Sequence, residues 1–141
     1  MFFGSYQYTI DDKGRLVIPS KMRSESGPVL FAMRGFEHCL SLYTQATFAQ
    51  FVQQMNQYDY NQVKVRQYLR TALASVIELI IDDHGRIQIP LDTLKQFKLE
   101  KNVKIIGIND HIEIWSEKVW ESYQSDAANQ FESHAANLNK K

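Results

Sequence analysis

A ten-residue segment occurs twice in this chain, and this repetition limits the possible folds more than any other feature. Residues 10–19 read IDDKGRLVIP and residues 81–90 read IDDHGRIQIP, so seven of the ten positions are identical at a constant offset of 71 residues. Such agreement is very improbable by chance in 141 residues, and internal repeats set the architecture of the chains that contain them. We therefore expect two copies of one unit, residues 1–75 and 76–141, packed together as one compact body.

A weaker similarity extends beyond this segment after the insertion of one residue. Residues 39–43 align with residues 111–115 at an offset of 72, and each stretch alternates in hydropathy, ends in a large aromatic residue and leads into a helical pattern. Thr44 and Ser116 occupy the expected N-cap positions of those two helices. The alignment predicts that both halves contain the same elements in the same order.

Hydrophobic periodicity and turn residues predict the elements of each half. In the first half we expect strands at residues 6–10, 15–18, 29–33 and 39–43, a short helix capped by Ser20, and helices after Thr44 and over residues 65–76. In the second half we expect strands at residues 76–81, 86–89, 103–108 and 111–115, a short helix at 91–97 and a helix after Ser116. The apolar face of that last helix is Trp120, Tyr123, Ala127, Phe131 and Leu138.

In each half the first two strands are joined by a tight turn. Gly14 supplies the positive φ that a hairpin turn requires, and Pro19 ends the return strand because proline cannot donate to a ladder. Eight short strands in two like sets predict an α+β fold, a β-barrel of two interleaved hairpin units with flanking helices. The duplication also predicts pseudo-two-fold symmetry within the chain.

Composition limits the function classes. The 16 basic residues balance the 16 acidic residues, whereas a nonspecific binder of polyanions carries a basic excess. Any nucleic-acid function then requires local charge placement or repetition of a small patch in an oligomer. The apolar runs are too short to span a membrane, and no signal peptide is visible. A single cysteine excludes a disulfide framework, so we expect a cytoplasmic protein.

The repeated turn has the strongest chemical signal in the sequence. Asp11 faces Arg15 across the first turn, and Asp82 faces Arg86 across the second, so each carboxylate orients a guanidinium through a charge-assisted bond. Guanidinium is the preferred group for phosphates and guanine edges. Two interpretations stay open on the residues alone. The pairs are either staples that set the hairpin register or devices that present the arginines to DNA.

Basic residues and backbone N–H groups surround both turns. Lys13 and His84 occupy the turn tips, and Gly14 and Gly85 offer backbone N–H groups for phosphate contacts. Lys21 and Arg23 follow on the short helix, so that the first motif reads as more basic than the second. We therefore expect the first half to contribute more to anion binding.

Other reactive residues form no pattern of a site. The four histidines show no two-ligand spacing on one element, and zinc needs three or four converging ligands. Cys39 in an alternating strand reads as a buried thiol. Arg66 and Arg70 read as a solvated helix face, and the alternative is a secondary contact to DNA or to a neighbouring subunit. We expect no catalytic site, no metal, no cofactor and no small-molecule substrate.

The residues resemble the MraZ family over essentially the whole chain. The resemblance rests on residues 1–4 (MFFG), 11–23 (DDKGRLVIPSKMR) and 81–90 (IDDHGRIQIP). It implies a swapped-hairpin, AbrB-like fold and a cytoplasmic, nucleoid-associated bacterial transcriptional regulator. It also implies a ring-shaped homo-oligomer that binds short direct repeats in double-stranded DNA upstream of the division and cell-wall gene cluster, its own promoter included. The family's DNA-contacting arginine corresponds to Arg15, and its second copy to Arg86.

One departure from the repeat is that His84 stands where the first turn has Lys13.

Two hypotheses remain for the function of the chain. It is either a sequence-specific DNA-binding regulator or a structural or protein-interaction ring in which the Asp–Arg turns only fix the fold.

Overall fold

The structure is a computed structural model that describes all 141 residues. Its strands are β1 (Ser5–Thr9), β2 (Arg15–Val17), β3 (Val29–Arg34), β4 (Leu40–Thr44), β5 (Ile77–Ile80), β6 (Arg86–Gln88), β7 (Asn102–Ile108) and β8 (His111–Ser116). Its α-helices are α1 (Ser20–Ser26), α2 (Gln45–Gln54), α3 (Val63–Ala74), α4 (Leu91–Gln96), α5 (Glu117–Asn129) and α6 (Phe131–Ala136). Short 3₁₀ turns lie at η1 (Phe36–His38) and η2 (Met55–Gln57). The predicted α+β class is confirmed.

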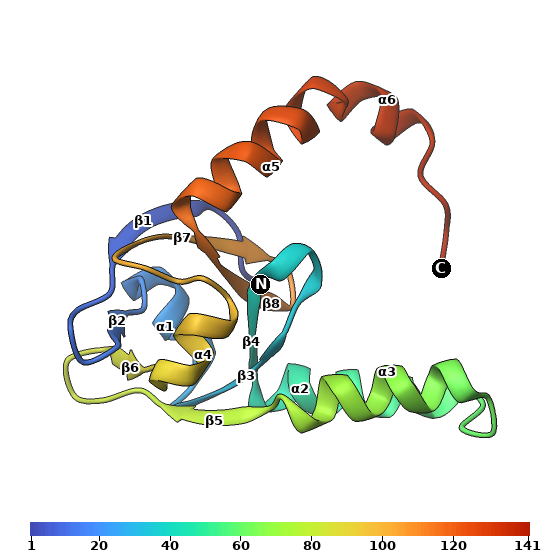
Figure 1. The fold of residues 1–141 in the computed structure, drawn as a ribbon, viewed down its shortest axis with the longest axis horizontal. Helices are drawn as coiled ribbons and strands as arrows, with labels where there is room; N and C mark the ends of the chain where they lie inside the picture. Colours follow the sequence, from blue (N-terminus) through green and yellow to red (C-terminus); the bar gives the residue numbers. More distant parts are fainter.

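Strands from the two halves of the chain are interleaved in one antiparallel sheet (Figure 1). The strand order is β1-β7-β8-β4-β3-β5, and β2 and β6 pair only with each other. Thus β1 lies beside β7, with Ser5 opposite Ile106, and β5 lies beside β3. The predicted β-barrel is not closed by hydrogen bonds, because β1 and β5 remain sheet edges and β2–β6 forms a separate two-stranded ribbon.

The predicted pairing of residues 6–10 with residues 15–18 in one hairpin is wrong. Asp11 N donates to Arg15 O at 3.1 Å, and beyond this bond β2 leaves β1 and pairs with β6. Packing explains the difference. Leu16 opposite Ile87 is completely buried at the centre of the ribbon, which places both apolar side chains over the sheet.

The main core lies between the ribbon and one face of the sheet. It contains ribbon residues such as Leu16 and Ile87 together with sheet residues such as Leu42, Ile105 and Ile112, all of them fully buried. Burial of apolar surface stabilises by roughly 25 cal/mol per Å², so this shared core holds the ribbon on the sheet. The position of the candidate turns therefore depends on residues from both halves.

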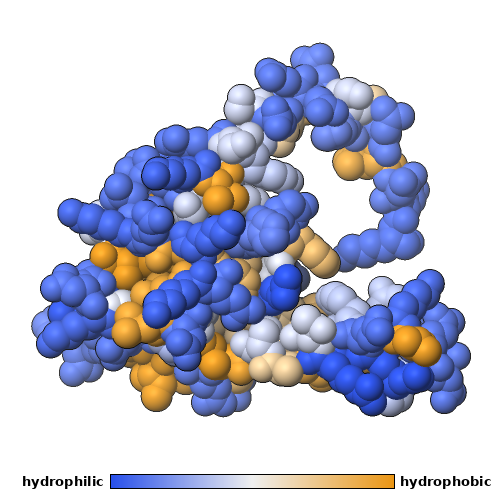
Figure 2. All heavy atoms as spheres, in the orientation of Figure 1, coloured by the Kyte–Doolittle hydropathy of each residue, from blue (hydrophilic) through white to orange (hydrophobic).

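Two smaller clusters cover the other face of the sheet. Met33, Tyr43 and Ala72 pack with residues of α2 and α3, and Cys39 and Trp115 pack with residues of α5. These contacts anchor two helical arms that project from the body of the molecule (Figure 1). We call residues 45–74 the hairpin arm and residues 117–136 the C-terminal arm. The arms leave an open gap between them, and Figure 2 shows hydrophobic spheres gathered mainly on the body.

The helix caps follow the sequence in part. Thr44 caps α2 as predicted, through a capping box in which its side chain accepts from Thr47 N at 3.0 Å. Ser116 is the N-cap residue of α5, yet its side chain makes no capping bond. The prediction that Ser20 caps α1 is wrong, because Pro19 already has the extended conformation of the N-cap and Ser20 begins the helix.

The C-terminal helix departs from its prediction. It breaks at Gln130 into α5 and α6, and the predicted apolar face does not continue beyond this break. Phe131 and Leu138 are 73% and 79% exposed, because no sheet face lies under this part of the arm. None of the helices has the length and apolar composition that crossing a bilayer requires.

Candidate nucleic-acid interface

The first repeated turn is organised around one carboxylate. The Oδ1 atom of Asp11 accepts from the backbone N–H groups of Lys13 and Arg15 at 3.0 and 2.9 Å. Its Oδ2 atom accepts from Arg15 Nε at 2.6 Å. Gly14 closes the turn with φ +81°, which confirms the expected left-handed glycine. The predicted contact between Asp11 and Arg15 is confirmed.

The second turn repeats this geometry with small differences in distance. Asp82 Oδ1 accepts from the backbone N–H groups of His84 and Arg86 at 2.8 and 2.9 Å, and Oδ2 accepts from Arg86 Nε at 3.0 Å. Gly85 has φ +76°. The substitution of histidine for lysine at the turn tip leaves this arrangement unchanged, because that residue takes part through its backbone N–H.

The hydrogen bonds keep both aspartates ionised. The backbone N–H of Arg15 has the largest influence and lowers the pKa of Asp11. Desolvation opposes it, and the Arg15 side chain and the Lys13 N–H lower the pKa further, so that the net shift is downward. The pKa of Asp82 is lowered in the same way by Arg86 and His84. Each arginine therefore faces a full negative charge that fixes its Nε.

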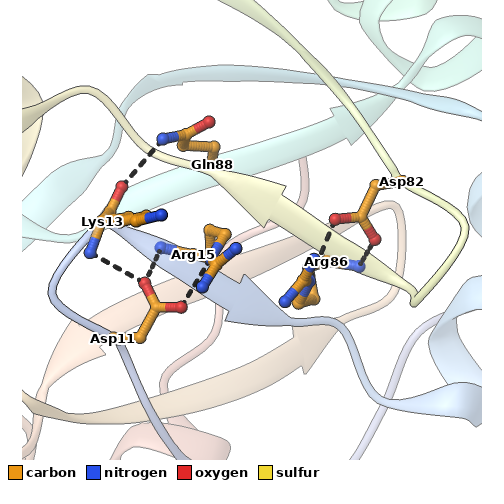
Figure 3. Close-up of polar contacts among 6 residues, drawn as sticks. All are labelled: Asp11, Lys13, Arg15, Asp82, Arg86 and Gln88. Atoms are coloured by element: carbon orange, nitrogen blue, oxygen red, sulfur yellow. Dashed lines mark hydrogen bonds and ion pairs between the residues drawn. The ribbon is translucent and has the colours of Figure 1, made fainter.

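The two arginines share the outer face of the β2–β6 ribbon (Figure 3). In the ribbon register Arg15 lies opposite Gln88, and Arg86 lies opposite Val17. Alternation along a strand places these four residues on one face and the buried pair of Leu16 and Ile87 on the other. Arg15 and Arg86 are thus diagonal neighbours, a relation that puts side chains about 7–8 Å apart.

Both guanidinium groups retain free donors. Asp11 and Asp82 engage only the Nε atoms, and the terminal amino groups of Arg15 and Arg86 make no hydrogen bond or ion pair within the protein. The side chains are 33% and 29% exposed. A guanidinium held at Nε and free at its outer edge is arranged to make a bidentate contact with a planar acceptor.

Sequence reasoning missed Gln88 as a member of this face. Its Nε2 atom donates to Lys13 O at 3.0 Å, so the second half of the chain supports the turn of the first half. The signal was present in the repeat, because Gln88 aligns with Val17 at the offset of 71. It was invisible without the knowledge that β2 pairs with β6.

The predicted basic cluster of the first motif does not form as expected, because Arg23 lies against the second turn. Its Nη1 atom donates to Ile18 O at 2.6 Å, and a Cβ added to Gly85 would collide with its guanidinium. At the first turn the corresponding contact is made by Leu94, whose Cδ1 atom would lie 3.5 Å from a Cβ on Gly14. The expectation of a more basic first turn is therefore wrong in its assignment of Arg23.

The predicted phosphate donors Gly14 and Gly85 are buried, and their N–H groups donate to Asp11 O and Asp82 O inside the turns at 3.0 and 2.9 Å, so these N–H groups are not free for phosphate.

The predicted side chains at the turn tips and on α1 lie at the surface. Lys13 and His84 are exposed at the turn tips, as the turn pattern requires. Lys21 is also exposed, but it borders a groove formed with Phe3 and Tyr6 that contains no turn residue. Arg66 donates from Nη1 to the carbonyl oxygens of residues 60 and 61, and so belongs to the hairpin arm.

The thiol of the chain is placed as expected. Cys39 is completely buried beneath the C-terminal arm. Burial, followed by the nearby charge of Glu113, raises the pKa of its thiol to about 12, so the sulfur stays protonated and unreactive at neutral pH.

The geometry of the ribbon suits one kind of contact. The major groove of B-DNA admits a two-stranded β-ribbon, and proteins of several folds read DNA with strands placed there. In that placement Arg15 and Arg86 would face base edges or phosphates, with the exposed tips of the turns beside them.

Comparisons with known proteins give a consistent family. A family model described as "MraZ protein, putative antitoxin-like" matches residues 1–71 and 73–141. A protein of Leuconostoc citreum named Transcriptional regulator MraZ is 38% identical over 138 residues, which cover 98% of this chain and 96% of that protein. Proteins of the same name from Moorella thermoacetica and Limosilactobacillus fermentum are 33% and 36% identical, over 98% and 96% of this chain and 96% and 95% of their own lengths.

Proposed function

The chain belongs to the MraZ family, and we propose that it is a transcriptional regulator that binds double-stranded DNA sequence-specifically through the β2–β6 ribbon. The observation that carries this proposal is the pair of aspartate-held guanidinium groups, Arg15 and Arg86, with free terminal donors on one exposed face. The names of the relatives support the regulatory role. The proposal assigns the chain no catalytic step.

The residues of the face have separate roles in this proposal. Arg15 and Arg86 contact guanine edges, where each bidentate contact discriminates by about 1–3 kcal/mol. Asp11 and Asp82 orient them. Phosphate contacts come from the side chains around the turns, and these contacts set the dependence of affinity on salt. The residues assigned to phosphate are Lys13, Lys21, Arg23 and His84.

The proposal includes a swapped-hairpin relation between residues 1–75 and 76–141, with a pseudo-two-fold axis through the ribbon. Two observations support it. If β5 is the counterpart of β1, β7 of β3 and β8 of β4, the sheet order reads the same from either edge. In the ribbon, Ile18 N donates to Gly85 O and Ile89 N donates to Gly14 O, so that each half makes the same bond to the other.

A ring-shaped homo-oligomer explains how a neutral subunit gains affinity. One subunit presents few DNA contacts and has no net charge, whereas a ring repeats the ribbon, so each added contact becomes intramolecular. The exposed apolar side chains of the two arms favour such an assembly, because aromatic residues are enriched at interfaces. They include Tyr58, Tyr60, Tyr123 and Phe131.

The operator is proposed from the family resemblance. A ring that repeats the β2–β6 ribbon by rotation suits DNA with short direct repeats and not a palindrome. We place these repeats upstream of the division and cell-wall gene cluster, including the promoter of the chain's own gene. The corresponding location is the cytoplasm, at the nucleoid.

A second candidate function is a structural ring in which the turns are staples. The observation that favours it is that each aspartate satisfies two backbone N–H groups of its own turn, which is a purely local role. It predicts that Asp11→Ala and Arg15→Ala lower the melting temperature or disassemble the ring, and that the wild-type protein shows no DNA preference.

Binding of the purified protein to its promoter fragment and to a scrambled duplex, over a salt series, tests the first proposal. We expect a preference of at least about 10³ for the promoter. Arg15→Ala and Arg86→Ala each reduce specific affinity by about 5- to 150-fold per reading contact, with fold and oligomer retained. Arg70→Ala serves as the charge-matched control, because Arg70 is exposed on the hairpin arm.

The outcomes separate the two functions. Equal, weak binding to both duplexes, or promoter affinity unchanged in folded Arg15→Ala and Arg86→Ala proteins, contradicts the DNA-reading ribbon. A loss of affinity in the Arg70→Ala control equal to that in the ribbon variants would show that only net charge matters.

A further inference from the structure

The two strands of the β2–β6 ribbon come from the repeated segment, but they are not identical. The two copies of that segment differ at three pairs of positions, which are Lys13 and His84, Leu16 and Ile87, and Val17 and Gln88. The first pair is exposed at the tips of the turns, and the second pair is completely buried. Only the third pair places different chemistry on the outer face of the ribbon, which it shares with the two arginines.

Each arginine of this face consequently has a different neighbour across the ribbon. Gln88 lies opposite Arg15, and Val17 lies opposite Arg86. Side chains directly opposite in an antiparallel pair have Cβ atoms about 4.5–5.5 Å apart, which is not far from the ~3.4 Å between successive phosphates along the axis of one DNA strand. In the proposed complex with DNA, an arginine and its neighbour would therefore reach adjacent base pairs.

The carboxamide of Gln88 is held in place and still has free hydrogen-bonding groups. Its Nε2 atom donates to Lys13 O at 3.0 Å, which fixes it beside the first turn (Figure 3). Its Oε1 atom and its second N–H make no hydrogen bond within the protein. Gln88 is exposed and borders an open hollow of about 500 Å³ between this turn and the start of α4. One free acceptor beside one free donor matches the N6 and N7 atoms of adenine in the major groove.

The two arginines by themselves would give the DNA contact no direction. The pseudo-two-fold axis proposed above relates them, so a ribbon with only Arg15 and Arg86 would read the same bases in either orientation on the duplex. Direct repeats require a reader whose two ends differ. Val17 and Gln88 supply that difference, because an apolar side chain suits the methyl group of thymine and a carboxamide suits adenine.

We propose that Gln88 is a specificity-determining residue of the ribbon, which reads an adenine beside the guanine contacted by Arg15. Val17 contacts a thymine methyl group beside the guanine contacted by Arg86. One ribbon thereby recognises a unit that differs from its own reverse complement, and this gives each repeat a direction. The inference rests on the proposed function, since it assigns bases to the DNA-reading face.

Selection of bound duplexes from a randomised DNA library, with the intact full-length protein, tests the assignment. The wild type should recover a unit that contains the adenine. Gln88→Val gives both strands the same valine, so we expect it to keep the guanines, to lose an adenine preference of about 5- to 150-fold and to select a unit equal to its own reverse complement. Gln67→Val removes an exposed glutamine from the hairpin arm, and as the matched control it should select the wild-type unit.

A double variant distinguishes base reading from support of the turn. Val17→Gln combined with Gln88→Val exchanges the two side chains, so the ribbon should again select the wild-type unit, bound in the reverse orientation. If Gln88 only supports the first turn through Lys13, Gln88→Val instead weakens binding to all duplexes equally, and the exchange restores nothing. Gln88→Glu retains the shape of the side chain and should move the preference from adenine to cytosine.

The outcomes separate this inference from the function on which it rests. If the wild type selects a unit and folded Gln88→Val selects the same unit with the same base preferences, the role of Gln88 is refuted while the DNA-reading ribbon stands. If the wild type selects no sequence, the proposed function fails and the assignment of Gln88 fails with it. Circular dichroism shows whether each variant is folded.

Discussion

The two turn glycines allow a matched test of the interleaved fold. Gly14 and Gly85 have almost the same positive φ, +81° and +76°, and both are buried. A Cβ added to either glycine would collide with an atom of the other half of the chain, but the colliding groups differ. At Gly14 it collides with the backbone carbonyl of Ile89, and at Gly85 with the flexible end of the Arg23 side chain.

The structure gives the expected magnitudes for alanine at each position. Left-handed backbone costs a residue with a Cβ about 1–2 kcal/mol, and both variants share that cost. Gly14→Ala must also displace a carbonyl of the ribbon, an overpacking cost of about 1–3 kcal/mol, for a total of about 2–5 kcal/mol. Arg23 can swing away from Gly85→Ala, so that variant should lose only about 1–2 kcal/mol.

Thermal unfolding at one protein concentration measures the difference, because the stability of an oligomer depends on concentration. At about 4 °C per kcal/mol for a chain of this size, we expect Gly14→Ala to melt about 8–20 °C below the wild type and Gly85→Ala about 4–8 °C below it. Equal losses in the two variants would refute the contact between the first turn and the Ile89 backbone. A larger loss in Gly85→Ala would refute the mobility of Arg23.

Three further predictions follow from the caps, the turns and the thiol. Thr44→Ala should cost about 1 kcal/mol of helix-cap stability, whereas Ser116→Ala, at a cap without a side-chain bond, should cost little; equal losses in urea unfolding would contradict the capping box. Folding lowers the pKa values of Asp11 and Asp82. The ionised carboxylates therefore stabilise the folded protein fully above the unfolded pKa near 4, and this contribution is lost as the pH falls through the lowered pKa values. Wild-type stability should therefore fall more steeply below about pH 4 than that of the double asparagine variant, and parallel curves would contradict this. The buried thiol of Cys39, with its pKa raised to about 12, should react with a disulfide reagent only after unfolding in urea; fast reaction of the folded protein would contradict its burial.

Local patterns in the sequence predicted local structure well. Seven identical positions in ten were enough to predict both turns, their glycine conformations and the contacts of Asp11 with Arg15 and of Asp82 with Arg86. The cap at Thr44 followed from a side chain that acts three residues away. These features depend on atoms close together in the chain, and side-chain chemistry specifies them directly.

Pairing between distant strands was not predictable from the same patterns. The alternation of residues 15–18 shows that Leu16 and Ile18 point to a core, but it does not show which strand lies beside them. The set of site residues predicted from the sequence consequently omitted Gln88, and Arg23 was assigned to the wrong turn.

The pairing of β1 with β7 also constrains how the protein is made. Ser5 finds its partner Ile106 only after most of the chain has been synthesised, and at about 5–20 residues per second the ribosome needs about 5–20 s to produce the intervening segment. During that interval the first strand has an unpaired edge, which is the condition that favours aggregation and recruits chaperones. A pause in translation before residue 102 should therefore leave a nascent chain that is more sensitive to protease than the finished protein. Within the first half only β3 and β4 pair with each other in the sheet, so β1 stays unpaired until the second half has emerged.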